Sequence, residues 1–335
     1  METLELKNPF TNAEIVGVDF DPTVYHTLKG QRGTKDFMMS NSSLKEFAAC
    51  PRKWKLGGEE EKDTDATEWG TLVDALALTP MHMRERFAVT PETYPDTKTG
   101  EPKPWTFNAN HCKAWKAEQV GKTIVKPCEL LGAQDAVKRL HDDPQIDALI
   151  NCSERQVFVQ AEYHDRDTNL IVPVKGLIDL VPDKSVEFYG RCIADLKTIR
   201  NGKPAFWKRE VFLRGYHIQA TLYLWLYVAA TGEDRTDFLH VLSENVPPYE
   251  PGRRLLSNEF QEAGRRFIIG ALRHYCQCLA TGIWPDYDWG TQNIRGWTIV
   301  SPESWMMAAE QDFPPFVDEV PVVGKVTSDP NDLIP

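Results

Sequence analysis

The sequence predicts an α/β protein of the α+β type, in which helices flank a mixed sheet. Residues 154–165, 170–181 and 188–199 are apolar runs separated by short polar turns, a pattern typical of three consecutive antiparallel strands. The elements expected after them are a helix over 204–231, a strand over 236–249 and a helix over 257–282. Strands and helices in this order predict a sheet with helices packed on it.

Helices are also expected before the sheet. Ser43–Trp54 is preceded by residues that can cap a helix, and a second helix runs from Asp65 or Thr67 to Leu78, just before a proline. Three more are predicted over 109–119, 127–141 and 144–151. Residues 90–108 are rich in Pro, Thr and Gly and have no periodicity, which predicts a long loop over a cleft.

The chain is long enough to bury a sizeable core, and we expect three parts. Residues 1–35 are interpreted as an N-terminal arm with one or two short strands, 36–300 as one domain and 301–335 as a tail rich in proline and acids. No apolar run approaches the length of a membrane span, and the first residues lack a signal-peptide pattern. The seven cysteines show no framework spacing, which favours free thiols and a cytoplasmic location.

One group of polar side chains follows the predicted strands. Asp179 ends the second strand, and Asp195 and Lys197 lie two residues apart on the third, so the last two face the same way. Gln219 and Tyr223 are four residues apart on the next helix and share a face. Neighbouring strands and the helix that follows them can bring all five side chains to one cleft.

These residue types suit metal-dependent hydrolysis of a phosphodiester. Mg²⁺ and Mn²⁺ prefer oxygen ligands, and Mg²⁺ usually takes one or two carboxylates together with waters and phosphate. A lysine beside the acids can orient the attacking water or stabilise the negative charge that develops. The alternative is that Asp179 and Asp195 are solvated strand-end acids and that Lys197 is their surface ion-pair partner.

The order of these motifs resembles the PD-(D/E)XK nuclease superfamily. The stretches that carry the resemblance are G-L-I-D (176–179), D-L-K (195–197), Q-A-T-L-Y (219–223), the Ser-rich segment 40–56 with Cys-Pro-Arg at 50–52, and the segment 69–87. The chain is most similar to the phage and prophage recombination exonucleases of the RecE (exonuclease VIII) type, followed by the RecB-nuclease-like group. The resemblance covers roughly residues 36–290 and implies a restriction-endonuclease-like core.

The resemblance implies a set of metal ligands with one departure. Asp179 and Asp195 would hold the metal, and Asp74 stands where such proteins usually carry a histidine. Aspartate is also a good magnesium ligand, so we expect Asp74 to assist. The alternative is a site that has lost one ligand. The resemblance further implies that Lys197 orients the water and that Gln219 and Tyr223 support the site.

The distribution of charge predicts where DNA binds. A net charge of −11 argues against a protein that coats nucleic acid, but residues 191–214 hold seven Lys or Arg against two acids. By resemblance, Ser43 and Arg52 are expected near a DNA end. The candidates for contact with DNA are Ser43, Arg52, Arg200, Lys203, Lys208 and Arg209. The alternative is that these residues form ordinary solvated helix faces.

The activity that the resemblance implies is a Mg²⁺-dependent DNA exonuclease, for which Mn²⁺ could substitute. It would resect duplex ends 5′ to 3′, leave 3′ overhangs for a single-strand annealing partner, and form a homo-oligomeric ring. Such a protein would be encoded by a phage or prophage and would work in the bacterial cytoplasm, away from membranes. Two alternatives stay open: a structure-specific or restriction-like endonuclease on the same core, and a catalytically inactive protein that binds DNA ends.

Overall fold

The computed structural model describes residues 7–57, 65–291, 293–295 and 297–301. Met1–Tyr287 forms one compact unit, and Asp288–Pro335 forms a second, in which β11 (Asn293–Ile294) pairs with β12 (Trp297–Thr298). The predicted tail, apart from its first residue, lies outside the described residues. No helix in the described part of the chain is long and apolar enough to cross a membrane. All seven cysteines are free thiols.

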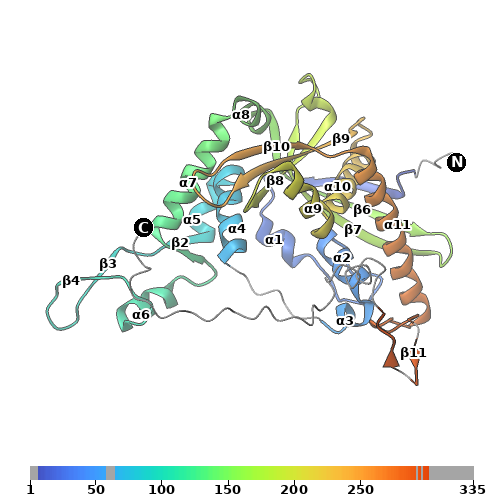
Figure 1. Cartoon of the computed structure of the whole chain (residues 1–335), viewed down its shortest axis with the longest axis horizontal. Coiled ribbons are helices and arrows are strands. Elements are labelled where there is room, and N and C mark those ends of the chain that lie inside the picture. The colour runs from blue at the N-terminus through green and yellow to red at the C-terminus, as the bar shows by residue number, and fades with distance from the viewer. Residues whose placement is uncertain (1–6, 58–64, 292, 296, 302–335) are drawn as a thin grey trace, which may run out of the picture. The chain divides into compact units, whose positions relative to one another are not determined.

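The compact unit is built on a six-stranded sheet with the order β1-β6-β7-β8-β9-β10 (Figure 1). Its strands are β1 (Phe10–Gly17), β6 (Ser153–Asp165), β7 (Leu170–Pro182), β8 (Cys192–Ile199), β9 (Asp237–Glu244) and β10 (Pro251–Leu255). The pairs β1–β6, β6–β7, β7–β8 and β9–β10 are antiparallel, whereas β9 runs parallel to β8. A parallel neighbour requires a crossover, which here contains two helices. The prediction of a mixed α/β sheet flanked by helices is confirmed.

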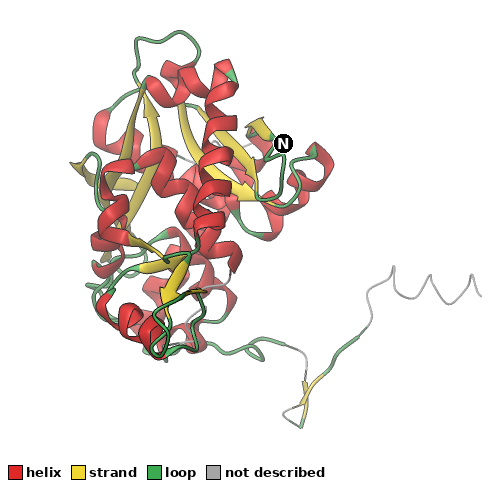
Figure 2. Ribbon diagram, turned by 90° about the vertical axis from the view of Figure 1, so that its left-hand side faces the viewer, coloured by secondary structure: helices red, strands yellow, loops and turns green. Residues whose placement is uncertain are grey.

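Helices cover both faces of the sheet (Figure 2). The helices of one face are α2 (Asn41–Ala49), α3 (Pro51–Lys55), α9 (Pro204–Leu213), α10 (Tyr216–Thr231) and α11 (Asn258–Thr281), and those of the other are α4 (Asp65–Leu78), α7 (Pro127–Asp142) and α8 (Pro144–Asn151). Alternate side chains of a strand point to opposite faces, so β8 contributes Ile193 to the first core and Leu196 to the second. Asp195 and Lys197 of β8 therefore share the face of α9 and α10.

The prediction of one continuous helix over 43–54 is wrong, because this segment forms two helices that meet at Cys50. This residue has an extended backbone, with φ −163° and ψ 98°, and it precedes Pro51. The proline ring disfavours helical geometry in the residue before it, so α2 ends there and α3 begins at the proline. The cap is Ser40, whose hydroxyl accepts a 3.3 Å bond from the Ser43 amide.

The predicted single helix over 204–231 is also two helices. Gly215 lies between α9 and α10 with a left-handed backbone, at φ 66°. A side chain here would be strained, and its Cβ would lie 2.8 Å from the Lys45 side chain. The break turns α10 onto the sheet, so that Gln219 and Tyr223 face the strand ends.

The edge strand β10 is not predicted from the sequence, and the other edge strand, β1, lies in the predicted arm, where one or two short strands are expected. Only Phe10 of β1 is buried, so this strand lacks an alternating pattern, and β10 is short and carries two arginines. The predicted strand over 236–249 ends at Glu244, and the third predicted strand begins at Cys192, after a 3₁₀ turn. An edge strand needs only one paired side and one buried face, so its pattern is weak.

Residues of the predicted arm and loop also have regular structure. The arm contributes β1 and α1 (Pro22–Thr27), and the loop holds a hairpin of β3 (Thr93–Pro95) with β4 (Pro102–Pro104). The remaining elements are η1 (Pro80–His82), α5 (Met83–Arg86), β2 (Phe87–Val89), α6 (Asn110–Glu118), β5 (Thr123–Val125) and η2 (Tyr189–Arg191). β2 and β5 pair in parallel beside α7.

The contact between α10 and α11 generates a prediction about stability. A Cβ on Gly264 would lie 2.6 Å from the His217 carbonyl oxygen and 2.4 Å from the Thr221 hydroxyl. We expect Gly264→Ala to lower the free energy of unfolding by about 1–3 kcal/mol, because the helices must move apart.

Gly270 on the same helix is the matched control, since a Cβ there meets nothing within 4 Å. Gly270→Ala should stabilise the protein by about 0.5–1 kcal/mol, because alanine loses less entropy in a helix. Urea unfolding measures both variants. Equal effects of the two substitutions would contradict the close helix contact.

Candidate active site

Asp179 lies where β7 and β8 separate. The two strands are in register at Leu180 and Ala194, and beyond that pair the Leu196 amide donates a 3.0 Å hydrogen bond to Asp179 Oδ2. The carboxylate thus satisfies a strand amide that would otherwise be unpaired. Because Leu196 lies between Asp195 and Lys197, this bond places the carboxylate of Asp179 beside both of these residues of β8.

Gln156 on β6 makes a second bond to the same carboxylate. Its Nε2 donates to Asp179 Oδ1 at 3.1 Å, and its backbone has a left-handed φ of 46°. The side chain is buried, at 5% exposure. The sequence analysis missed this residue, although a glutamine within an apolar strand was a signal for it. Gln156 fixes the orientation of Asp179.

Asp195, Lys197, Gln219 and Tyr223 form a connected group, as their spacing predicts. Lys197 Nζ and Asp195 Oδ2 form an ion pair in which the aspartate is only 1% exposed. Gln219 Nε2 donates to Asp195 Oδ1 at 2.9 Å and to the Tyr223 hydroxyl at 3.2 Å. The solvated surface ion pair considered above is therefore not what the structure shows.

His240 backs this group from β9, where it is the register partner of Asp195. The ring is packed among aromatic side chains, with Trp207 at 5.1 Å and Phe238 at 5.0 Å between ring centroids. Burial lowers the pKa of His240 to about 4, although Asp195 opposes the shift. A neutral imidazole therefore lies behind the carboxylate, and the sequence analysis did not identify it.

A cavity of about 220 Å³ brings Asp74 to Asp179. Asp74 reaches it from α4, Tyr223 from α10 and Gln156 from β6, so the cavity is lined from both helix layers. This is possible because β7 and β8 diverge at this point. α4 also approaches the sheet closely, since a Cβ on Gly70 would lie 2.8 Å from the Thr198 hydroxyl.

The acids repel one another, and Lys197 offsets part of that repulsion. Burial, followed by the neighbouring Asp195, raises the pKa of Asp179 well above its usual range. Burial also raises the pKa of Asp74 to about 7, with Lys197 opposing the shift. Burial lowers the pKa of Lys197, but Asp195 and Asp179 outweigh it, so the net shift is upward and the amine is protonated.

The residues fit a divalent cation that keeps part of its water shell. Asp74 Oδ1 is buried and has no hydrogen-bond partner among the described residues. A buried oxygen of this kind can be satisfied by a cation or a water molecule. Within the described residues, no three His, Cys, Asp or Glu side chains are close enough to chelate one ion. A hydrated Mg²⁺ with one or two carboxylates needs no such group.

The six candidates for contact with DNA lie outside the cavity. The Ser43 hydroxyl accepts a bond of 3.1 Å from Ser40 and is nearly buried, whereas Arg52 pairs with Asp286 at 3.1 Å. The other four, Arg200, Lys203, Lys208 and Arg209, are exposed around the end of β8 and on α9. These four are on the chain segments that adjoin Lys197 and Tyr216, and contact with DNA stays a prediction.

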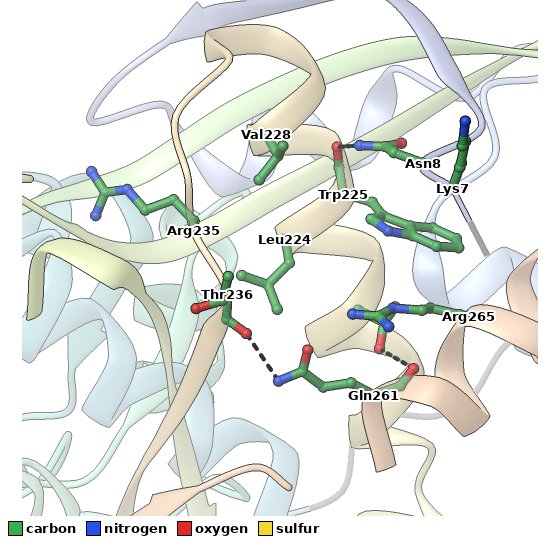
Figure 3. A pocket seen from close by; sticks show the side chains of 10 residues that line it. Lys7, Asn8, Leu224, Trp225, Val228, Arg235, Thr236, Gln261 and Arg265 are labelled. Atoms are coloured by element: carbon green, nitrogen blue, oxygen red, sulfur yellow. Dashed lines mark hydrogen bonds between the residues drawn. The ribbon is translucent and has the colours of Figure 1, made fainter. Parts of the chain in front are cut away.

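A second cavity, of about 320 Å³, lies on another side of α10 (Figure 3). It is lined by Trp225 and Asn8, whose Nδ2 donates to the Trp225 carbonyl at 2.7 Å, and by Arg265 beside Gln261. None of the described residues that line it is acidic. Of these two cavities, the one with the aspartates is therefore the one whose residues suit a hard cation.

Residues 40–294 match a family described as a PDDEXK-like domain of unknown function (DUF3799). No curated protein matches the chain. The solved structures that resemble it include a "Putative exonuclease" from Eubacterium rectale, with 17% identity, coverage of 87% of this chain and 98% of that chain, and a TM-score of 0.49. Another is SSO0001, with 16% identity, coverage of 69% and 82%, and a TM-score of 0.26. Identities at this level say nothing about the chemistry of the site.

The raised pKa of Asp74 predicts how stability depends on pH. Folding favours its neutral form, so its contribution to stability is full below its usual pKa of 3.8 and is lost as the pH rises through about 7. In EDTA, we expect the melting temperature to fall as the pH rises from about 5 to about 8, and Asp74→Asn to reduce this fall.

Asp135→Asn, which changes an exposed carboxylate on α7, is the control and should keep the slope of the unsubstituted protein. Thermal melts across this pH range measure all three proteins. A steeper fall in Asp74→Asn, or the same slope in all three, would contradict the burial of an uncompensated carboxylate.

Proposed function

We propose that this chain, which belongs to the PDDEXK-like domain family of unknown function (DUF3799), is a metal-dependent DNA exonuclease. The observation that carries the proposal is the bond from the Leu196 amide to Asp179. It gathers Asp179, Asp195 and Lys197 at one point, beside a cavity that Asp74 also lines. Two acids and a lysine on diverging strands are the parts that hydrolysis of a phosphodiester needs.

Asp179 and Asp195 would hold the metal, with Asp74 assisting, and we propose that the metal is Mg²⁺ with Mn²⁺ as a substitute. When bound, such an ion lowers the pKa of a coordinated water and offsets charge on the phosphate. Lys197 is protonated, so it acts as a hydrogen-bond donor that positions the water or the phosphate oxygen, rather than as a base.

Gln219 and Tyr223 act through the groups they touch. The amide of Gln219 holds the Asp195 carboxylate, which leaves the other oxygen of that carboxylate for Lys197. Burial, with Asp195 and Asp179 beside it, raises the pKa of Tyr223, so its hydroxyl keeps its proton and can donate to a ligand in the cavity.

The finer proposals rest on the resemblance of the motifs. The enzyme would degrade one strand of a duplex end 5′ to 3′ and leave a 3′ overhang for recombination by strand annealing. Its partners would be double-stranded DNA ends, a single-strand annealing protein and further copies of itself in a ring. The exposed basic residues of α9 and of the turn before it would contact the DNA backbone.

Digestion of end-labelled linear duplex tests the activity. We expect degradation from the ends with Mg²⁺ or Mn²⁺ and none in EDTA, because the carboxylates cannot activate water alone. Covalently closed circular DNA is the control and should remain intact. Cleavage of the circle would favour the endonuclease, and no metal-dependent cleavage of either DNA would favour an inactive protein that binds ends.

Lys197→Ala tests the role of the lysine. We expect loss of at least about a hundredfold in kcat, the usual cost of losing one positioned donor, with the affinity for linear duplex in Ca²⁺ nearly unchanged. The control is Lys184→Ala, which removes an exposed lysine that is paired with Glu233 at 3.6 Å. If Lys197→Ala cleaves as fast as the control, the lysine takes no part in catalysis.

A further inference from the structure

Arg86 lines the catalytic cavity and forms no ion pair with the described acids there. The guanidinium comes from the end of α5, and the cavity that it lines also contains Asp74 and Asp179. Its nearness to Asp21 and Asp74 raises the pKa of Arg86, yet burial outweighs both and the net shift is downward. No Asp or Glu in the described ranges comes within 4.0 Å of Arg86.

The described contacts of this guanidinium use few of its hydrogen-bond donors. Arg86 Nη1 donates to the Thr79 hydroxyl at 3.3 Å, and the group lies 5.6 Å from the centre of the Phe87 ring. An arginine has five N–H donors in a planar fork, and burying such a charge without an acid is costly. A partly buried arginine that lines a cavity and has unused N–H donors is suited to binding a planar or tetrahedral anion.

The size of the cavity limits what that anion is. A volume of about 220 Å³ holds roughly seven water molecules, which is room for a phosphate and part of its sugar but not for a duplex. His26 and Tyr25 of α1 close another side. A strand would therefore enter singly, with its phosphate between the carboxylates and Arg86.

We propose that Arg86 binds a phosphate of the DNA strand inside the catalytic cavity, which it lines together with Asp74 and Asp179. This inference rests on the proposed function, because it assigns the substrate contact of the same cavity. The geometry favours arginine over lysine, since the fork can bind two phosphate oxygens at once. The phosphate is either the one being cleaved or the one at the end of the strand.

The test compares Arg86→Gln, Arg86→Lys and Arg84→Gln in the full chain. Arg84 lies two residues away on the same short helix and is exposed, so its variant removes an equal charge outside the cavity. For linear duplex with Mg²⁺, we expect Arg86→Gln to raise KM at least tenfold, Arg86→Lys to recover part of the loss, and Arg84→Gln to match the unsubstituted protein. Thermal melts establish that each variant folds.

Duplexes with 5′-phosphate or 5′-hydroxyl ends separate the two sources of the phosphate. If Arg86→Gln impairs only the phosphorylated end, Arg86 holds the terminal phosphate; if it impairs both ends equally, Arg86 holds the phosphate being cleaved. A folded Arg86→Gln with an unchanged KM, or a loss equal to that of Arg84→Gln, overturns the proposal. The proposal is also overturned if KM rises as much in Arg86→Lys as it does in Arg86→Gln.

Binding of the same duplexes in Ca²⁺, followed by fluorescence anisotropy, keeps this inference separate from the proposed function. If the unsubstituted protein binds DNA but never cleaves it, the nuclease proposal fails. In that case the comparison of Arg86→Gln with Arg84→Gln still tests the phosphate contact, because the comparison measures only the affinity for DNA. Weaker binding of Arg86→Gln than of Arg84→Gln supports the phosphate contact, and equal binding rejects it.

Discussion

The hydrogen bond between the Leu196 amide and the Asp179 carboxylate is the constraint on which the site depends. Two strands that separate leave backbone amides unpaired, and an unpaired buried amide is costly. The carboxylate satisfies one such amide, so the strands can diverge. Their divergence gives α4 and α10 access to one cavity from opposite faces of the sheet. The same bond therefore stabilises the divergence of β7 and β8 and places the Asp179 carboxylate beside Lys197.

That arrangement concentrates negative charge in a poorly solvated place. Asp74, Asp179 and Asp195 face one lysine, and burial raises the pKa of both Asp74 and Asp179. A site of this kind is unfavourable for the isolated protein and becomes favourable when a cation enters. Arg86 adds a positive charge to the lining of the same cavity. An anion with a divalent cation beside it would balance both sets of charges.

The sequence was sufficient for the central sheet and for the five residues gathered on β7, β8 and α10. Their spacing has a short period, which local geometry dictates. It was insufficient where long-range packing decides: β1 has one buried residue, and the break at Gly215 depends on how α10 meets the sheet. Gln156 and Arg86 reach the site from other elements, so no local pattern around the motifs could identify them. The break at Cys50–Pro51, by contrast, could have been predicted from the sequence, because a proline disfavours helical geometry in the residue before it.

The central claim is that the carboxylates of Asp179 on β7 and Asp195 on β8 bind a divalent cation, with Asp74 of α4 assisting. Crystals of the protein soaked in Mn²⁺ and measured near the manganese absorption edge test it most directly. The account predicts an anomalous peak in contact with Asp179 and Asp195, and within reach of Asp74 directly or through water. A well-ordered structure at high Mn²⁺ with no peak at these carboxylates, or with the ion bound elsewhere on the chain, would contradict it.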